Sequence, residues 1–307
     1  MTKVFIDGSA GTTGLRIRER LEARRDIELI LLPEEQRKQP EARRDALHAA
    51  DIAFLCLPDD AAREAVALAG DSDAAIIDTS TAHRTAEGWV YGMAELKGQR
   101  PRIAASKRIA NPGCHASGFI ALVAPLVEAG VIARDARLSC FSLTGYSGGG
   151  KKMIADYENN GRDPLLDAPR QYGLSQNHKH LKEMAAVCRL DAPPVFSPIV
   201  ADFYSGMEVS VPLFGEWAEG GIDRIRQVYA DVYAGPVIRY VESADEAGFL
   251  SAGRLSGSDA MEVTVSGNDE RMLLTARFDN LGKGASGAAI QNMNIRLGLN
   301  ESEGLVI

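Results

Sequence analysis

The sequence predicts an α/β protein with two domains. The first is a Rossmann-type doubly wound parallel sheet, and the second is an α+β domain with a mostly antiparallel sheet. Two observations lead to this prediction. Over residues 3–78, short apolar runs alternate with helical patterns, and a glycine-rich loop follows the first run. After residue 112, strand-like runs outnumber helical stretches.

The first domain begins with the alternation that is typical of βαβ units. Strands are predicted at residues 3–7, 27–32, 52–57 and 74–78, and helices at 15–24 and 59–69. The segment 33–44 is polar and strongly charged. Since connections between parallel strands make right-handed crossovers, the loop after the first strand is expected at the carboxyl end of the sheet.

The second domain begins after a turn sequence at residues 111–115. Strands are predicted at residues 138–144, 195–200, 207–213, 237–241, 261–266 and 272–279, and helices at 116–129, 177–187 and 222–233. A final helix is predicted over 285–297, with Gly298 as its C-cap. Its apolar residues recur at helical spacing, which indicates one buried face. We expect this helix to return to the first domain, so that the domains comprise residues 1–112 with 286–307, and residues 113–285.

Charge and hydropathy exclude several classes of protein. The chain has 34 basic and 42 acidic side chains, and its net charge of −8 disfavours nucleic acid or an anionic membrane as a partner. The longest apolar stretch, 119–133, is interrupted by Pro125, Glu128 and Gly130 and is shorter than the roughly 20 residues of a membrane span. The first residues lack the apolar core of a signal peptide, so a cytoplasmic location is expected.

The four cysteines lie far apart and form no C-x-x-C pair. This pattern predicts free thiols and argues against a disulfide framework or a zinc site. Two of the five histidines, His178 and His180, lie close together, but they lack the spacing of helical metal ligands. No metal is therefore expected.

The glycine-rich loop predicts a nucleotide site. Gly8, Gly11 and Gly14 directly follow a strand and open a helix, where glycine permits a tight turn and close approach to a pyrophosphate. The N–H groups at the start of the helix would bind the phosphates. The remaining residues of the expected cofactor loop are Ser9, Ala10, Thr12 and Thr13.

The end of the second strand bears on the choice of cofactor. The carboxylates of Glu34 and Glu35 would suit the ribose 2′-hydroxyl of NAD, whereas Arg37 and Lys38 would suit the 2′-phosphate of NADP. The residues alone do not decide between NAD and NADP. They are also compatible with a charged loop that is simply solvated and binds no cofactor.

Cys114 is the candidate nucleophile. It follows Asn111-Pro112-Gly113 and precedes an apolar helix, and a helix N-terminus favours the thiolate form. The adjacent His115 is expected to be structural, because neighbouring side chains on a helix rarely face each other. A second candidate pair is His180 and Glu183, whose spacing on a helix would let the carboxylate orient the imidazole.

Taken together, these motifs resemble the N-acetyl-gamma-glutamyl-phosphate reductases of the shorter type. The resemblance covers nearly the whole chain. The remaining segments that carry it are residues 78–84, 91–96, 279–287 and 291–292. The related aspartate-semialdehyde dehydrogenases have Asn-Cys without Pro-Gly and lack the His-x-His-x-x-Glu run. The longer reductases continue with Tyr-Pro-Thr, where this chain has His115-Ala116-Ser117.

The resemblance implies NADPH-dependent reductive dephosphorylation of N-acetyl-γ-glutamyl phosphate to its semialdehyde, in arginine biosynthesis. It implies that Cys114 is the nucleophile, that His180 is the acid/base and that Glu183 orients it. It also implies that the second domain carries catalysis and dimerisation, in a homo-oligomer. Further residues are expected to bind the cofactor, namely Ser80, Lys283 and Gly284, or the substrate, namely Arg84, Asn111 and His178. Two alternatives remain at this point: an aspartate-semialdehyde dehydrogenase, and a non-catalytic NADP-binding redox sensor in which Cys114 is oxidised.

Overall fold

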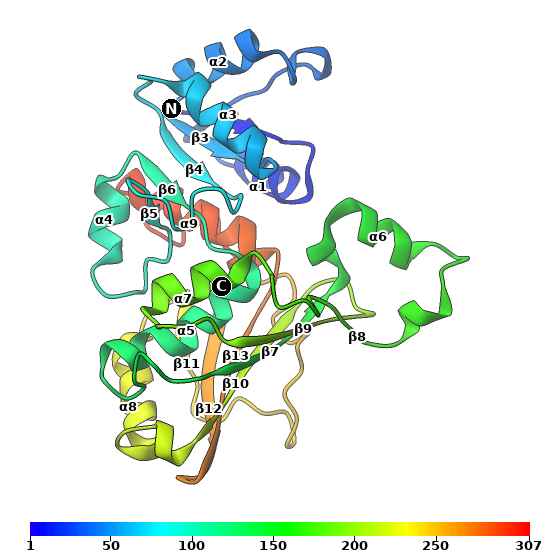
Figure 1. Ribbon diagram of the computed structural model, residues 1–307. Helices are drawn as coiled ribbons and strands as arrows, with labels where there is room; N and C mark the ends of the chain where they lie inside the picture. Colours follow the sequence, from blue (N-terminus) through cyan, green and yellow to red (C-terminus); the bar gives the residue numbers. More distant parts are fainter. The chain divides into compact units, whose positions relative to one another are not determined.

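The computed structural model describes residues 1–307, which form two compact units (Figure 1). Unit 1 comprises Met1–Ala94, Gly98–Gly113 and Ala285–Leu305. Unit 2 comprises Glu95–Lys97, Cys114–Gly284 and Val306–Ile307. The chain therefore passes from unit 1 to unit 2 at the candidate nucleophile.

Unit 1 contains a six-stranded parallel sheet with the strand order β2-β1-β3-β4-β6-β5. Its strands are β1 (Thr2–Asp7), β2 (Ile27–Ile30), β3 (Ile52–Leu55), β4 (Ala75–Asp78), β5 (Val90–Tyr91) and β6 (Arg108–Ala110). The central strands are buried because their side chains are apolar on both faces, as in β3, whose four residues are all buried. The predicted doubly wound sheet is confirmed.

Most helices of unit 1 bury one side against this sheet, whereas the last helix, expected to have one buried face, is buried almost all round. The helices are α1 (Thr12–Glu22), α2 (Pro40–Ala49), α3 (Asp59–Ala69), α4 (Gln99–Ala105) and α9 (Gly287–Arg296). In α9, Ile290 and Met293 lie in one core cluster with Val4 and Ile6 of β1. The helix is capped by Leu297, and Gly298 follows it with a φ of +70°.

Unit 2 contains a seven-stranded mixed sheet with the strand order β11-β12-β13-β10-β7-β9-β8. Four pairings are antiparallel (β10 with β13 and β7, β12 with β13, β8 with β9), and two are parallel (β11 with β12, β7 with β9). The expected mostly antiparallel sheet is therefore present. Its strands are β7 (Ser139–Gly145), β8 (Arg170–Gln171), β9 (Val195–Ala201), β10 (Met207–Phe214), β11 (Ile238–Tyr240), β12 (Met261–Gly267) and β13 (Arg271–Phe278).

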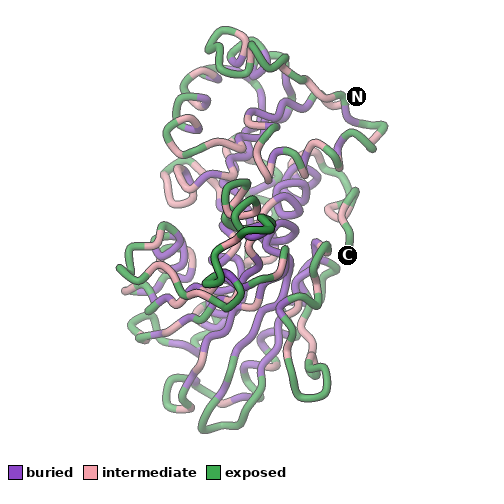
Figure 2. The backbone as a smooth tube through the Cα atoms, turned by 90° about the vertical axis from the view of Figure 1, so that its right-hand side faces the viewer, coloured by how far each residue is buried: buried purple, intermediate pink, exposed green.

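The helices of unit 2 are α5 (Cys114–Glu128), α6 (Gly150–Glu158), α7 (His180–Cys188) and α8 (Gly221–Val232). Most of α5 is buried, because it packs on the sheet and also against α7 and α8. Figure 2 shows the buried residues of the chain in purple, along its inner strands and helices. Gly118 allows the close approach: a Cβ built there would lie 2.5 Å from Val209 Cγ2 of β10. The contact fixes the start of α5, and with it Cys114, relative to the sheet of unit 2.

Short helical turns connect these elements. They are 3-10 turns at Glu34–Gln36, Tyr146–Gly149, Pro164–Asp167 and Gly215–Trp217, and a π turn at Gly282–Ser286. The π turn occupies the first residues of the stretch that the sequence predicts as the final helix. None of the helices combines the length and apolarity that crossing a membrane requires.

Candidate active site

The glycine-rich loop has the local structure of a phosphate-binding turn. Gly8 has a φ of +87°, and a Cβ there would lie 2.3 Å from the carbonyl oxygen of Cys56. A Cβ on Gly14 would lie 2.4 Å from the carbonyl oxygen of Gly8. Both glycines are therefore required by close backbone contacts within unit 1. The helix α1 that follows has no side-chain cap and no acidic residue in its first turn, so its N-terminus suits an anion.

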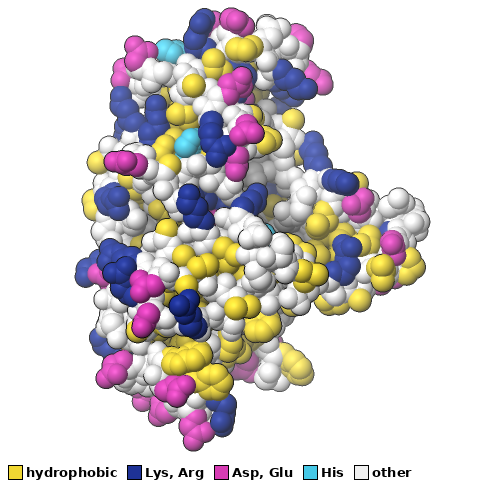
Figure 3. Space-filling model, viewed as in Figure 1, with side chains coloured by type: hydrophobic (Ala, Val, Ile, Leu, Met, Phe, Trp, Pro, Cys, Tyr) yellow, Lys and Arg dark blue, Asp and Glu magenta, His cyan; other side chains and the backbone are white.

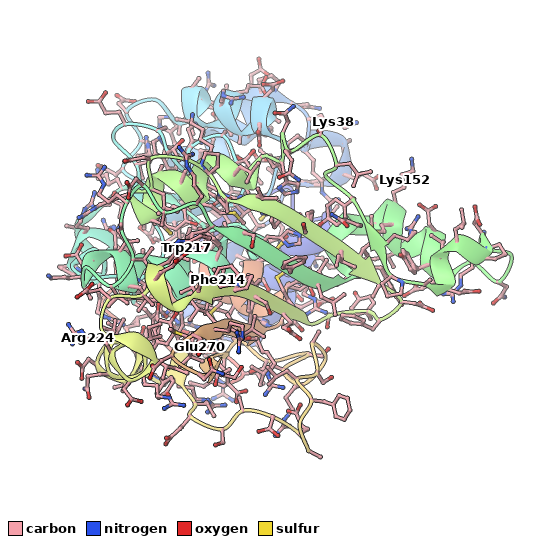
Figure 4. The ribbon with its side chains drawn as sticks, turned by 60° about the horizontal axis from the view of Figure 1, so that its bottom comes forward. Lys38, Lys152, Phe214, Trp217, Arg224 and Glu270 are labelled. Carbon is pink, nitrogen blue, oxygen red and sulfur yellow. The ribbon has the colours of Figure 1, made fainter.

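The loop after β2 carries the two basic residues expected to select the cofactor. Arg37 and Lys38 are both exposed, and Figure 4 labels Lys38 on this loop. The Nε atom of Arg37 donates to the carbonyl oxygen of Leu32 at 3.2 Å. This bond holds the guanidinium close to the carboxyl end of β2, where dinucleotide-binding folds recognise the ribose.

The other predicted residues of unit 1 make internal contacts. Ser80 donates to both carboxylate oxygens of Asp78, at 2.9 Å from its N–H and 2.7 Å from its hydroxyl. Arg84 donates from Nε to the carbonyl oxygen of Asn111 and from Nη2 to that of Thr79, each at 3.0 Å. The Asn111 side chain donates to the carbonyl oxygen of Ala285 at 3.0 Å. These bonds order the loops after β4 and β6, and the cofactor and substrate roles of the three residues stay predictions.

Cys114 is the first residue of α5, and it is partly exposed. The three other thiols are poor nucleophiles, because burial raises the pKa of each: that of Cys56 to about 12, and those of Cys140 and Cys188 above their usual range. Among the four cysteines, position and exposure therefore favour Cys114.

The π turn before α9 packs against the thiol. A Cβ built on Gly284 would lie 3.0 Å from Cys114 Cβ. The buried carboxylate of Asp279 shapes this turn by accepting from the N–H groups of Leu281 at 2.7 Å and Gly282 at 3.2 Å. A side chain on Gly284 would crowd Cys114, so Gly284 borders the candidate nucleophile.

Lys283 is buried in the same turn. Its Nζ lies 2.8 Å from Oε1 of Glu95, and the two side chains are only 2% and 8% exposed. This ion pair ties the π turn to the segment Glu95–Lys97 within unit 2. The carboxylate of Glu95 explains how the charged ammonium of Lys283 can be buried. The expected contact between Lys283 and a cofactor stays a prediction.

The predicted pair of His180 and Glu183 lies on the first turn of α7. Both side chains are buried, and His180 Nε2 lies 3.9 Å from Glu183 Oε1. That separation is within ion-pair range, and catalytic contacts of this kind commonly tighten when substrate binds. Because α5 packs against α7, the two helices bring this pair to the region of Cys114.

His178 precedes α7 and helps to start it. Its Nδ1 accepts from the backbone N–H of His180 at 3.3 Å. Burial lowers the pKa of His178, and the neighbouring charge of Lys179 adds to the effect. A neutral imidazole that accepts at Nδ1 carries its proton on Nε2, which is then the atom available to a ligand.

Sequence reasoning missed a cluster of rings around His115. Its ring centroid lies 5.5 Å from that of His180, 5.7 Å from that of His178 and 6.1 Å from that of Tyr172. The nitrogens of His115 contact the hydroxyls of Ser142 and Tyr172. Adjacency in sequence to Cys114 was the only available signal, since no periodicity relates residues 115, 142 and 172.

Comparison with protein families gives two matches. A model described as semialdehyde dehydrogenase, NAD binding domain, matches residues 3–104. A model described as semialdehyde dehydrogenase, dimerisation domain, matches residues 114–280. The two matched segments correspond to the main segments of unit 1 and unit 2.

Individual relatives cover nearly the whole chain. It is 50% identical over 306 residues to the N-acetyl-gamma-glutamyl-phosphate reductase of Brucella anthropi, covering 96% of this chain and 98% of that protein. For the reductase of the same description from Brucella ovis, the identity is 49%, with 96% and 99% covered.

Solved structures show the same fold. Aspartate semialdehyde dehydrogenase II from Vibrio cholerae has a TM-score of 0.74 at 17% identity, covering 97% of this chain and 99% of that chain. Aspartate semialdehyde dehydrogenase from Francisella tularensis has a TM-score of 0.72 at 14% identity, with 96% and 99% covered. At these identities the likeness concerns the fold alone.

Proposed function

Since the chain belongs to the semialdehyde dehydrogenase family, we propose that it is the oxidoreductase that reduces N-acetyl-γ-glutamyl phosphate to N-acetyl-glutamate semialdehyde, in arginine biosynthesis. The full-length identity of 50% to a reductase of that description supports this substrate. The observation that carries the chemistry is the placement of Cys114 at the start of α5, with the buried His180–Glu183 pair on the adjoining α7.

Cys114 acts first in this proposal. Its thiolate attacks the carbonyl carbon of the acyl phosphate, the C–O bond to phosphate breaks, and inorganic phosphate leaves a thioester on the sulfur. The start of α5 supports the thiolate, because the partial positive charge of a helix N-terminus lowers a thiol pKa. The turn at Gly284 can approach Cys114 closely, because Gly284 carries no side chain.

His180 is the proposed acid/base that donates and accepts the proton of the hemithioacetal hydroxyl. After reduction of the thioester carbon, the resulting oxyanion needs a proton, and collapse of the hemithioacetal to the aldehyde returns one. His180 is the better candidate of the two neighbouring histidines, because it has a carboxylate partner, Glu183. His178, whose Nδ1 is engaged by the backbone, is proposed to contact the substrate through Nε2.

We propose that unit 1 binds nicotinamide adenine dinucleotide phosphate. The matched NAD binding domain includes the whole glycine-rich loop and the loop after β2. We assign the pyrophosphate to the N-terminus of α1 and the 2′-phosphate to Arg37 and Lys38. When bound, NADPH supplies the hydride for the thioester carbon.

Replacement of the two basic residues tests the cofactor assignment. In Arg37→Ala/Lys38→Ala, we expect the KM for NADPH to rise by about tenfold or more, with the KM for NADH nearly unchanged. Each lost charge-assisted hydrogen bond to the 2′-phosphate costs on the order of 1.5–3 kcal/mol. Steady-state kinetics with both cofactors measure the effect. Arg44→Ala, which removes an exposed arginine of α2, is the matched control. Equal use of both cofactors by the unmodified chain would contradict the assignment.

The substrate is tested by assay with two acyl phosphates. Oxidation of NADPH should depend on N-acetyl-γ-glutamyl phosphate and should be at background level with β-aspartyl phosphate. The reverse preference would identify an aspartate-semialdehyde dehydrogenase. If neither acyl phosphate were reduced while Cys114 was readily oxidised, the redox-sensor alternative would be favoured.

A second copy of this chain is the proposed partner of unit 2. The matched model describes residues 114–280 as a dimerisation domain. The strand register places Phe141, Val195, Phe214 and Leu273 on one face of the sheet. They are 49%, 61%, 55% and 37% exposed. Hydrophobic side chains are visible over unit 2 in Figure 3, and Figure 4 labels Phe214 beside Trp217 at the end of β10. Pairing of two such faces would remove this apolar surface from water.

The dimer is tested by size-exclusion chromatography with light scattering, which gives the mass of the protein in solution. The unmodified chain should have the mass of at least two copies, and Phe141→Asp/Leu273→Asp should raise the dissociation constant by at least about 100-fold. Burying unpaired carboxylates in an apolar interface costs several kcal/mol. Leu299→Asp, an exposed apolar position in unit 1, should leave the mass unchanged. A monomeric unmodified chain would refute the proposal.

A further inference from the structure

Ser142, His115 and Tyr172 form a hydrogen-bonded chain at the start of α5. His115 Nδ1 lies 2.6 Å from Ser142 Oγ, and His115 Nε2 lies 2.6 Å from the Tyr172 hydroxyl. His115 and Ser142 are buried, at 4% and 0% exposure, and Tyr172 is half-buried. Ser142 belongs to β7, His115 to α5 and Tyr172 to the segment after β8. This series of hydrogen bonds therefore forms only when unit 2 is folded.

The imidazole in this chain is neutral at physiological pH. Burial, together with the neighbouring His178, lowers the pKa of His115 to about 3. A neutral imidazole has one N–H donor and one acceptor nitrogen, so each of its two bonds has a defined direction. His115 is therefore not proposed as a second acid/base. Its ring instead links the hydroxyl groups of Ser142 and Tyr172.

Tyr172, at one end of this series of hydrogen bonds, is linked to the residue next to the candidate nucleophile. Burial raises the pKa of the Tyr172 phenol, and a negative charge on Cys114 raises it further. The geometry agrees, because the Tyr172 hydroxyl lies 2.6 Å from Nε2 of His115, the residue next to Cys114, and it remains a protonated hydroxyl that can donate. His115 itself follows Cys114 directly on the first turn of α5.

We propose that His115 is a positioning residue that holds the Tyr172 hydroxyl as a hydrogen-bond donor to the Cys114 thiolate. In this arrangement Ser142 donates to Nδ1, the Nε2–H donates to the phenol oxygen, and the phenol proton points to the sulfur. The thiolate is then stabilised by a charge-assisted hydrogen bond in addition to the helix N-terminus. The inference deepens the proposed function and rests on Cys114 being its nucleophile.

The test is the pH dependence of Cys114 alkylation by iodoacetamide, followed on the Cys114 peptide by mass spectrometry. At neutral pH, we expect Tyr172→Phe and His115→Phe each to slow alkylation by about tenfold and to raise the apparent pKa of the thiol, because each removes the bond to the thiolate. The double variant should be no more than about twofold slower than either single variant, because the two residues act as one unit.

Two further variants separate positioning from general damage. His115→Gln keeps an N–H that can donate to the phenol, and it should restore most of the alkylation rate. His48→Gln, which changes an exposed histidine of α2, should have no effect. The titratable groups that face His115 from neighbouring elements are His178, His180 and Tyr172, and they remain in both single variants of His115.

The outcomes are distinguishable. If Cys114 is alkylated in Tyr172→Phe as fast as in the unmodified chain, or if the two single effects multiply in the double variant, the positioning role is wrong. The role of Cys114 as nucleophile is then decided separately, by the turnover of Cys114→Ala. If the unmodified Cys114 reacts no faster than free cysteine and is dispensable for turnover, the proposed function itself has failed. Should His115→Phe not fold, Tyr172→Phe decides alone, since it removes one hydroxyl from a half-buried side chain.

Discussion

Replacement of Cys114 by Ala is expected to lower turnover by at least about 10⁴-fold, because loss of the nucleophile removes the covalent route altogether. The binding of NADPH should be unchanged, since the glycine-rich loop belongs to unit 1 and Cys114 to unit 2. Steady-state NADPH oxidation measures the first effect, and quenching of protein fluorescence on titration with NADPH measures the second.

Cys188→Ala is the matched control for this experiment. Cys188 is a buried thiol of α7, and burial holds its pKa well above the usual range, so it should be inert. Its replacement should cost stability at most, with the turnover of the folded protein nearly unaffected. Retention of most of the activity in Cys114→Ala would mean that the reaction is not covalent at this thiol.

Replacement of His180 by Ala is expected to lower kcat by about 10²–10⁴-fold, the usual contribution of one acid/base group. The KM for the acyl phosphate should change much less, because the proposed role of His180 lies in proton exchange. Alkylation of Cys114 should persist in this variant. The measurement is kcat and KM at several pH values. If His180 exchanges the proton, its ionisation should appear in the pH profile of kcat for the unmodified chain and be absent from that of His180→Ala.

Two neighbouring variants sharpen the assignment of His180. Glu183→Gln keeps the shape of the side chain and removes its charge, so it should lower kcat less than His180→Ala does. His178→Ala should act mainly on KM, since His178 Nδ1 is engaged by the backbone N–H of His180. A larger loss of kcat in His178→Ala than in His180→Ala would exchange the roles of the two histidines.

Local sequence patterns were sufficient for the doubly wound class and for four strands of its sheet, but not for the short strands β5 and β6. They also supply the residues of the candidate site, whose roles stay predictions. Gly8 and Gly14 are predictable because a Cβ at either position would collide with the backbone nearby in the chain or on the next strand. The helix α9 is predictable because Ile290 and Met293 recur at the helical period and enter a core with β1. Cys114 and the pair of His180 and Glu183 lie within short motifs at helix starts.

Features that depend on long-range contacts were not predictable. The helix α2 was missed because its sequence is strongly charged, and the buried Arg43 has its charge paired with Asp7 and Glu64, which are distant in sequence. The buried partner of Lys283 is Glu95, 188 residues away in sequence. The chain of Ser142, His115 and Tyr172 likewise joins three separate elements, and no period in the sequence relates them.

The most direct test of covalent catalysis is to mix the enzyme with N-acetyl-γ-glutamyl phosphate in the absence of NADPH. We expect a burst of one phosphate per site, together with an N-acetyl-glutamyl adduct confined to the Cys114 peptide. Both signals should be lost in Cys114→Ala, and the adduct should disappear when NADPH is added. A burst without an adduct, an adduct on another residue, or a burst that persists in Cys114→Ala would contradict covalent catalysis at Cys114.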